Sequence, residues 1–329
     1  MSSRRHTFNI GLNVTGMVLP MLVGVVTVPG LLHRLGEERF GILALGWALV
    51  GYFGFLDLGM GRALTQYLAS AEQAGVSREE QATVACAARR MLGALSLGLA
   101  LMLSLLLPWL ASFVTMPADL HVQTLAATPL LALAVPLAMW FSCSAGVLEA
   151  RSRFAAVNSV RIPAGVGNFV APWLVSLLTT DLYWVISSVV VMRLAGALGL
   201  AWWARPEFAL PAPRWPSAGI RQLLRFGGWM TVSNLVGPVM SYFDRFAIAA
   251  WVTVAAVTHY TVPFDVISRL PMVPLAIMGV LLPLLAQASH SVPGTHPQHY
   301  ATVTHTVKLL LVCWIPGMVL TAWIGPWLL

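Results

Sequence analysis

The sequence predicts an all-α polytopic membrane protein with about nine transmembrane helices. Of its 329 residues, 58% are hydrophobic and only 9% are charged, against about 25% charged in an ordinary soluble domain. So few charged side chains do not cover the surface of a soluble protein of this size, and much of that surface must therefore face lipid. The apolar stretches lack the two-residue alternation of a membrane β-barrel, which leaves helices as the spanning elements.

A helix needs about 20 predominantly apolar residues to cross the bilayer. The first stretch that meets this criterion is too long for a signal-peptide core and has no small-residue cleavage site, so we expect it to be a retained span. The predicted spans are 9–32, 40–62, 86–108, 124–148, 160–179, 182–204, 226–251, 256–287 and 306–328.

Arginines set the predicted orientation, because short cytoplasmic loops carry an excess of basic residues. They gather at the N-terminus and in the connections after the second, fourth and sixth spans, whereas the alternate connections hold only Arg34 and Arg39. We therefore expect a cytoplasmic N-terminus.

The longest connection, 62–90, is expected to form two helices that protrude from the membrane. Gly75 suits the end of the first helix, and Ser77 and Glu80 have the spacing of a capping box at the start of the second. The sequence therefore predicts a tight turn here and no separate soluble domain.

Proline marks the predicted boundary between two halves. Four prolines fall within residues 205–225 and favour an extended cytoplasmic linker: Pro206, Pro211, Pro213 and Pro216. The predicted domains are an N-terminal six-helix lobe (1–204), this linker (205–225) and a three-helix part of a C-terminal lobe (226–329). A Phe precedes a Pro by the same interval in the first and seventh spans, at 8 and 20 and at 226 and 238, a weak sign of a parallel repeat.

Three arginines at membrane depth are the predicted cationic substrate site: Arg193, Arg245 and Arg269. A charge at the bilayer centre costs about 2.5–3.5 kcal/mol on insertion scales, so such residues usually face the bundle interior or water. Guanidinium groups suit phosphate oxygens, which favours an anionic headgroup as cargo. For Arg193 the alternative is an arginine satisfied by a carbonyl or a distant carboxylate.

Acidic residues supply the predicted gate or ion-coupling positions. These are Asp57, Asp244 and Asp265, together with Arg62. Asp265 and Arg269 are four residues apart and can instead neutralise each other on one helix face. Asp57, five residues before Arg62, can equally be an interfacial ion pair or a helix cap.

Motifs for metal binding and catalysis are missing from the sequence. The histidines around Pro293 have no pair at the spacing of a two-His zinc motif, and no Walker loop or Gly-x-Ser-x-Gly elbow occurs. The three cysteines show no Cys-x-x-Cys spacing. We therefore expect no enzyme activity, resident cofactor, metal site or nucleic-acid partner, with coupling to Na⁺ or H⁺ left open.

Two groups of motifs resemble a known family. The first runs from Leu35-Gly36 and Phe40-Gly41-Ile42 through Gly51-Tyr52-Phe53 to Leu56-Asp57-Leu58-Gly59, and the second from Phe226 to Trp229 and from Tyr242 to Arg245. Together they resemble bacterial polysaccharide flippases of the O-antigen and teichoic-acid type, within the multidrug, oligosaccharidyl-lipid and polysaccharide exporter superfamily. The likeness extends over nearly the whole chain.

The resemblance implies a two-lobed inner-membrane transporter that flips undecaprenyl-pyrophosphate-linked oligosaccharide, an anionic lipid-linked glycan, by alternating access. It also implies membrane lipids and polysaccharide-assembly proteins as partners. Members of the family have twelve or fourteen spans, so we expect the second lobe to be incomplete. The alternatives are a multidrug and toxin extrusion-type cation antiporter, which favours acidic cavities, and a polytopic glycan polymerase or ligase, which needs a larger outer loop.

Overall fold

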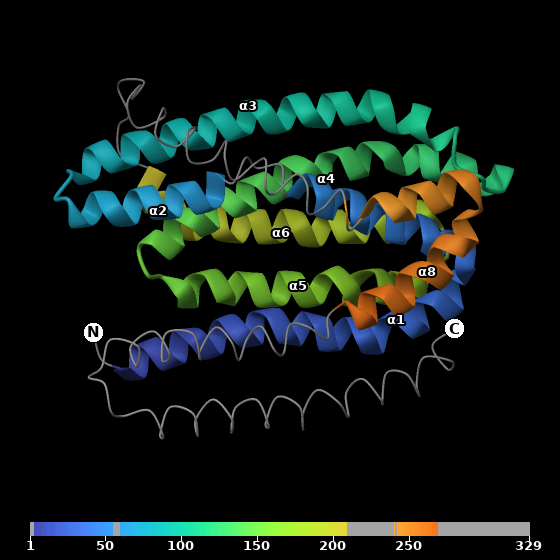
Figure 1. The fold of residues 1–329 in the computed structure, drawn as a ribbon, viewed down its shortest axis with the longest axis horizontal. Coiled ribbons are helices and arrows are strands. Elements are labelled where there is room, and N and C mark those ends of the chain that lie inside the picture. The colour runs from blue at the N-terminus through green and yellow to red at the C-terminus, as the bar shows by residue number, and fades with distance from the viewer. Residues whose placement is uncertain (1–2, 55–59, 209–239, 241, 269–329) are drawn as a thin grey trace, which may run out of the picture. The chain divides into compact units, whose positions relative to one another are not determined.

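The protein is all-α, as the sequence predicts. The computed structural model describes residues 3–54, 60–208, 240 and 242–268, and these hold helices and turns without a strand (Figure 1). The helices are α1 (Ser3–Gly54), α2 (Met60–Gln73), α3 (Arg78–Ala111), α4 (Ala118–Ala150), α5 (Phe154–Ser176), α6 (Leu182–Phe208) and α8 (Val254–Ile267). Residues 242–251 are also helical.

The chain forms two compact units, Met1–Thr258 and His259–Leu329. Helices α1 to α6 and the helix 242–251 belong to the first unit, whose packing is described below. The predicted linker lies largely outside the described residues, so the division into lobes at 205–225 stays a prediction.

Helix α1 is two spans joined at a glycine. Gly36 has φ 77° and ψ 166°, outside the helical region, and φ > 0 is easily reached only by glycine. Before this point α1 runs along α5, with Gly16 beside Asn158 and Gly30 beside Trp173. After it the chain doubles back along α4, where Arg39 pairs with Asp119 at 3.6 Å (Figure 1). These two halves match the first two predicted spans.

Four segments of the described chain are long and apolar enough to cross a membrane: Val18–Gly51, Arg78–Ala111, Ala118–Ala150 and Leu182–Phe208. Their outward faces carry large apolar side chains such as Val26 (77% exposed) and Leu105 (74%). Such side chains are stable on an outer surface in contact with lipid. The protein is therefore a multi-pass membrane protein, and the last two predicted spans lie largely or wholly outside the described residues.

Helix α4 is the centre of the first unit, since it packs against α2, α3 and α6, while α5 lies against α1 and α6. Helices α2 and α4 cross closely, where Gly146 faces the carbonyl of Gly61. Thr65 Oγ1 donates to the carbonyl oxygens of both glycines at 3.0 Å. Small residues let helix backbones approach closely in membranes, and a hydroxyl then links them.

The predicted α2–α3 turn is confirmed. Gly75 has φ 73°, and Ser77 Oγ accepts a hydrogen bond from Glu80 N–H at 3.2 Å. The cap satisfies one of the free N–H groups at the start of α3. The same end of the bundle carries most of the arginines described below.

Candidate functional site

Two of the three predicted substrate arginines fall in described parts of the chain. Arg193 lies near the middle of α6, and Arg245 lies on the helix 242–251. Arg269 and Asp57 lie outside the described residues. The predictions for these two positions, including the Asp265–Arg269 pair, stay untested.

Arg193 carries a buried guanidinium nitrogen. Its Nε has no hydrogen-bond partner among the described residues, although the surrounding helix is strongly apolar. Buried N–H groups nearly always have a partner from protein, water or ligand. The position is therefore suited to an acceptor that the described chain does not supply.

Arg245 is 4% exposed, and its guanidinium lies 5.2 Å from the centre of the Tyr242 ring. A cation over an aromatic face is attracted by the ring quadrupole, and more strongly where water is excluded. Asp244 is turned toward the backbone, because its Oδ1 accepts from Arg245 N–H at 2.8 Å. Arg245 is thus held by Tyr242, a contact that sequence alone did not indicate.

The second half of α1 runs between the helices that carry these two arginines. On one side, Trp47 packs against Phe169 with ring centres 5.4 Å apart, and shares a small void with Val189 and Val190, about one turn before Arg193. On the other side, a Cβ at Gly51 would lie 3.2 Å from the hydroxyl of Tyr242.

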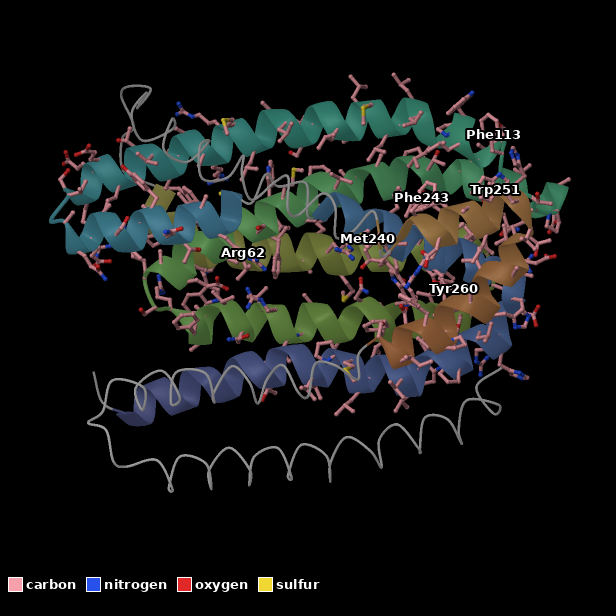
Figure 2. The ribbon with its side chains drawn as sticks, viewed as in Figure 1. Arg62, Phe113, Met240, Phe243, Trp251 and Tyr260 are labelled. Carbon is pink, nitrogen blue, oxygen red and sulfur yellow. The ribbon has the colours of Figure 1, made fainter. Side chains whose placement is uncertain are left out.

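An apolar cavity of about 480 Å³ opens beside Tyr242. Its walls come from the second half of α1, the end of α3, the start of α4 and the helix 242–251. Backbone hydrogen bonds hold this last helix in place, because Thr115 N–H donates to Ala249 O and Val254 N–H donates to Thr115 O, both at 3.3 Å. Figure 2 shows Phe113, Phe243 and Trp251 gathered at this end of the bundle.

The two threonine hydroxyls of the cavity wall are already satisfied. Thr124 Oγ1 donates to Leu120 O at 2.8 Å, and Thr128 Oγ1 donates to Leu125 O at 2.8 Å. The remaining lining side chains are apolar apart from the Tyr242 hydroxyl. The cavity therefore offers mainly van der Waals and hydrophobic contact to whatever enters it.

The other predicted gate residues are scattered. Arg62 is exposed on α2 and lies toward the opposite end of the bundle from Trp251 (Figure 2). Asp265 lies on α8 in the second unit, where Ser268 Oγ donates to its backbone carbonyl at 3.4 Å. The described residues include no group of three or more His, Cys, Asp or Glu side chains placed to hold a metal ion.

The role of Arg151, whose side chain links several helices at one end of the bundle, was not predicted from the sequence. The Arg151 side chain is 7% exposed and forms ion pairs with Glu72 of α2 and Glu207 of α6, each at 3.1 Å. Its Nη1 also donates to Gln81 Oε1 of α3 at 2.8 Å. Arg151 follows α4, so four helices meet on one guanidinium, and no local motif signals pairing across such sequence distances.

Further arginines lie over aromatic rings at this same end, which we call the basic end and define by Arg78, Arg151, Arg153 and Arg205. Arg153 lies 5.5 Å from the Trp203 ring centre, and Arg205 lies 5.0 Å from that of Trp202. Aromatic rings and basic side chains of this kind favour the boundary between lipid and water. The opposite end holds the Arg39–Asp119 pair.

Comparison with known proteins identifies the family of the chain. The sequence profile of a family described as "Polysaccharide biosynthesis protein" matches residues 7–289. The chain belongs to the polysaccharide biosynthesis protein family. This assignment confirms the resemblance drawn from the motifs between Leu35 and Gly59.

One relative of the chain is a Shigella flexneri protein with the name "Putative O-antigen transporter". It is 25% identical to the chain over an alignment of 322 residues that covers 95% of the chain and 75% of the relative. No solved structure matches the chain significantly.

Proposed function

We propose that the protein flips undecaprenyl-pyrophosphate-linked oligosaccharide across the bacterial inner membrane for surface polysaccharide synthesis, by alternating access. The family match and the name of the Shigella relative support a polysaccharide transporter. The several spans and the buried arginines support a cargo that combines a lipid chain with an anionic headgroup.

The observation that carries this proposal is the pair of arginines at membrane depth. Arg193 has a buried Nε without a described partner, and Arg245 is almost completely buried beside Tyr242. Guanidinium groups bind phosphate oxygens with several N–H donors in a fixed plane. The two arginines lie on different helices, on either side of the second half of α1, so we infer that each offers a separate contact for the anionic headgroup, and Arg269 is a third candidate.

The proposed orientation places the basic end in the cytoplasm. Arg151, Arg153 and Arg205 lie at this end, and an excess of basic residues is typical of cytoplasmic loops. The N-terminus and the α2–α3 turn are then cytoplasmic, and the turn between α3 and α4 faces the outer side. Asp244, next to Arg245, remains a candidate for coupling to Na⁺ or H⁺, together with Asp57 and Asp265.

Complementation tests the proposal. The protein, expressed in a strain that lacks its own lipid-linked glycan flippase, should restore surface polysaccharide. Arg193→Ala and Arg245→Ala should abolish the rescue at matched membrane abundance, and Arg205→Ala at the basic end should retain it. Full rescue by both interior variants would contradict a role of these arginines, and resistance to cationic drugs without rescue would indicate a cation antiporter.

A further inference from the structure

Tyr242 joins two features of very different chemistry. One side of its ring carries the guanidinium of Arg245 at 5.2 Å, and the same residue lines the apolar cavity of about 480 Å³. A charged group and a hydrocarbon-like space therefore meet at one side chain. A ligand that spans this junction needs an anionic head followed directly by an apolar chain.

We propose that the cavity binds the phosphate-proximal part of the polyprenyl chain while the pyrophosphate lies at Arg245. This inference rests on the proposed function and adds the location of the chain to it. The cavity falls in the range of about 300–1,000 Å³ that is typical of ligand sites. It therefore accommodates a segment of one chain, and the rest of the polyprenyl chain extends into the bilayer.

The chemistry of the wall selects a hydrocarbon segment. The hydroxyls of Thr124 and Thr128 already donate to carbonyls of their own helix, so the segment that enters needs no hydrogen-bonding group. Ala247 and Ala250 leave space on the wall formed by the helix 242–251. A polyprenyl pyrophosphate joins its single chain directly to the phosphate, whereas the glycerol of a phospholipid separates its phosphate from two chains.

The direction of the cavity also fits this ligand. The helix 242–251 rises about 14 Å from Tyr242 to Trp251 at 1.5 Å per residue, and Trp251, 81% exposed, lies at the end opposite to the basic end. With the basic end in the cytoplasm, the head lies nearer the cytoplasm and the chain occupies the outer half. The substrate thus keeps the head-to-tail direction of a cytoplasmic-leaflet lipid, and the site holds it before it turns over.

Photo-crosslinking tests the location of the chain without a variant. The full-length protein in nanodiscs is irradiated with an undecaprenyl pyrophosphate that carries a diazirine near the phosphate end of the chain, and the labelled peptides are identified by mass spectrometry. We expect labels on residues 242–251 and the end of α3, lost on competition with unlabelled undecaprenyl pyrophosphate. Equal labelling of these peptides by a diazirine phosphatidylglycerol, without such competition, would overturn the proposal in favour of general bilayer lipid.

Cavity-filling variants provide the second test. Ala247→Leu and Ala250→Leu should each weaken binding of undecaprenyl pyrophosphate by about tenfold, the loss expected when about two buried methylene groups no longer fit. Binding of inorganic pyrophosphate should not change, and the matched control Ala126→Leu, on an exposed position of α4, should bind both ligands as the unmodified protein does. Unchanged affinity in both cavity variants would overturn the chain site, whereas no binding of either ligand to the unmodified protein would contradict the proposed function itself.

Discussion

Arg151 and Arg193 are the same residue type in two opposite settings. Arg151, at the basic end, contacts two carboxylates and an amide from three other helices. Arg193, in the apolar middle of α6, leaves a buried Nε without a described partner. Burial is therefore common to both arginines, and we propose that the presence or absence of partners marks Arg151 as structural and Arg193 as functional.

The different settings of Arg151 and Arg193 have different energetic consequences. A buried guanidinium that is paired with carboxylates stabilises the arrangement of its neighbours, and removal of the group leaves uncompensated charges behind. A guanidinium at membrane depth without such partners costs insertion free energy and is retained where a function needs it. Mutations at the two sites should therefore affect different properties of the protein.

The largest expected effect is the loss of transport when Arg193 is replaced. Arg193→Ala should lower lipid-linked oligosaccharide export at least tenfold, because a charge-assisted contact with the cargo is lost. The amount of folded protein should be unchanged or higher, because the variant avoids the insertion cost of the charge. Surface polysaccharide and membrane abundance, measured in the same cells, check this, and a parallel loss of both quantities would assign Arg193 a structural role.

The second largest effect is expected on the stability of the protein when Arg151 is replaced. Arg151→Ala should destabilise the protein by about 3 kcal/mol, because Glu72 and Glu207 lose their shared partner and Glu207 is mostly buried. Thermal unfolding in detergent measures the change. Transport per folded molecule should remain near that of the unmodified protein, and a stable but inactive variant would place Arg151 in the transport site.

A smaller effect on stability is expected at Gly146, where the backbones of α2 and α4 cross beside the basic end. Gly146→Ala should cost about 1–3 kcal/mol, since the new Cβ would press against the backbone carbonyl of Gly61. Gly98→Ala on α3 is the matched control, because nothing lies near a Cβ added there. Equal stability of the two variants in detergent would contradict the close α2–α4 crossing.

The smallest effect on stability is expected at Arg205, an exposed arginine of the basic end. Arg205→Ala removes a contact with the Trp202 ring and should cost less than about 1 kcal/mol. Transport should persist. A large loss of transport or stability would mean that exposed arginines at this end contribute to that property as well as to the orientation of the protein in the membrane.

Hydropathy and local turn residues predicted the parts of the fold that depend on neighbours in sequence. The long apolar helices and the capped start of α3 at Ser77 follow from such patterns, and the membrane depth of Arg193 and Arg245 stays a prediction. Hydropathy did not indicate that a single broken helix joins the first two spans at Gly36. The partners of Arg151 and the contact of Arg245 with Tyr242 depend on where helices pack, and the cavity depends on side chains from four helices.

A flipping assay with purified protein measures directly whether Arg193 takes part in transport. The full-length protein is reconstituted into liposomes, and lipid-linked oligosaccharide that crosses to the opposite leaflet is captured by a lectin added on one side. We expect flipping by the unmodified protein and by folded Arg151→Ala, and at least tenfold slower flipping by Arg193→Ala. Equal flipping rates for Arg193→Ala and the unmodified protein would contradict this expectation.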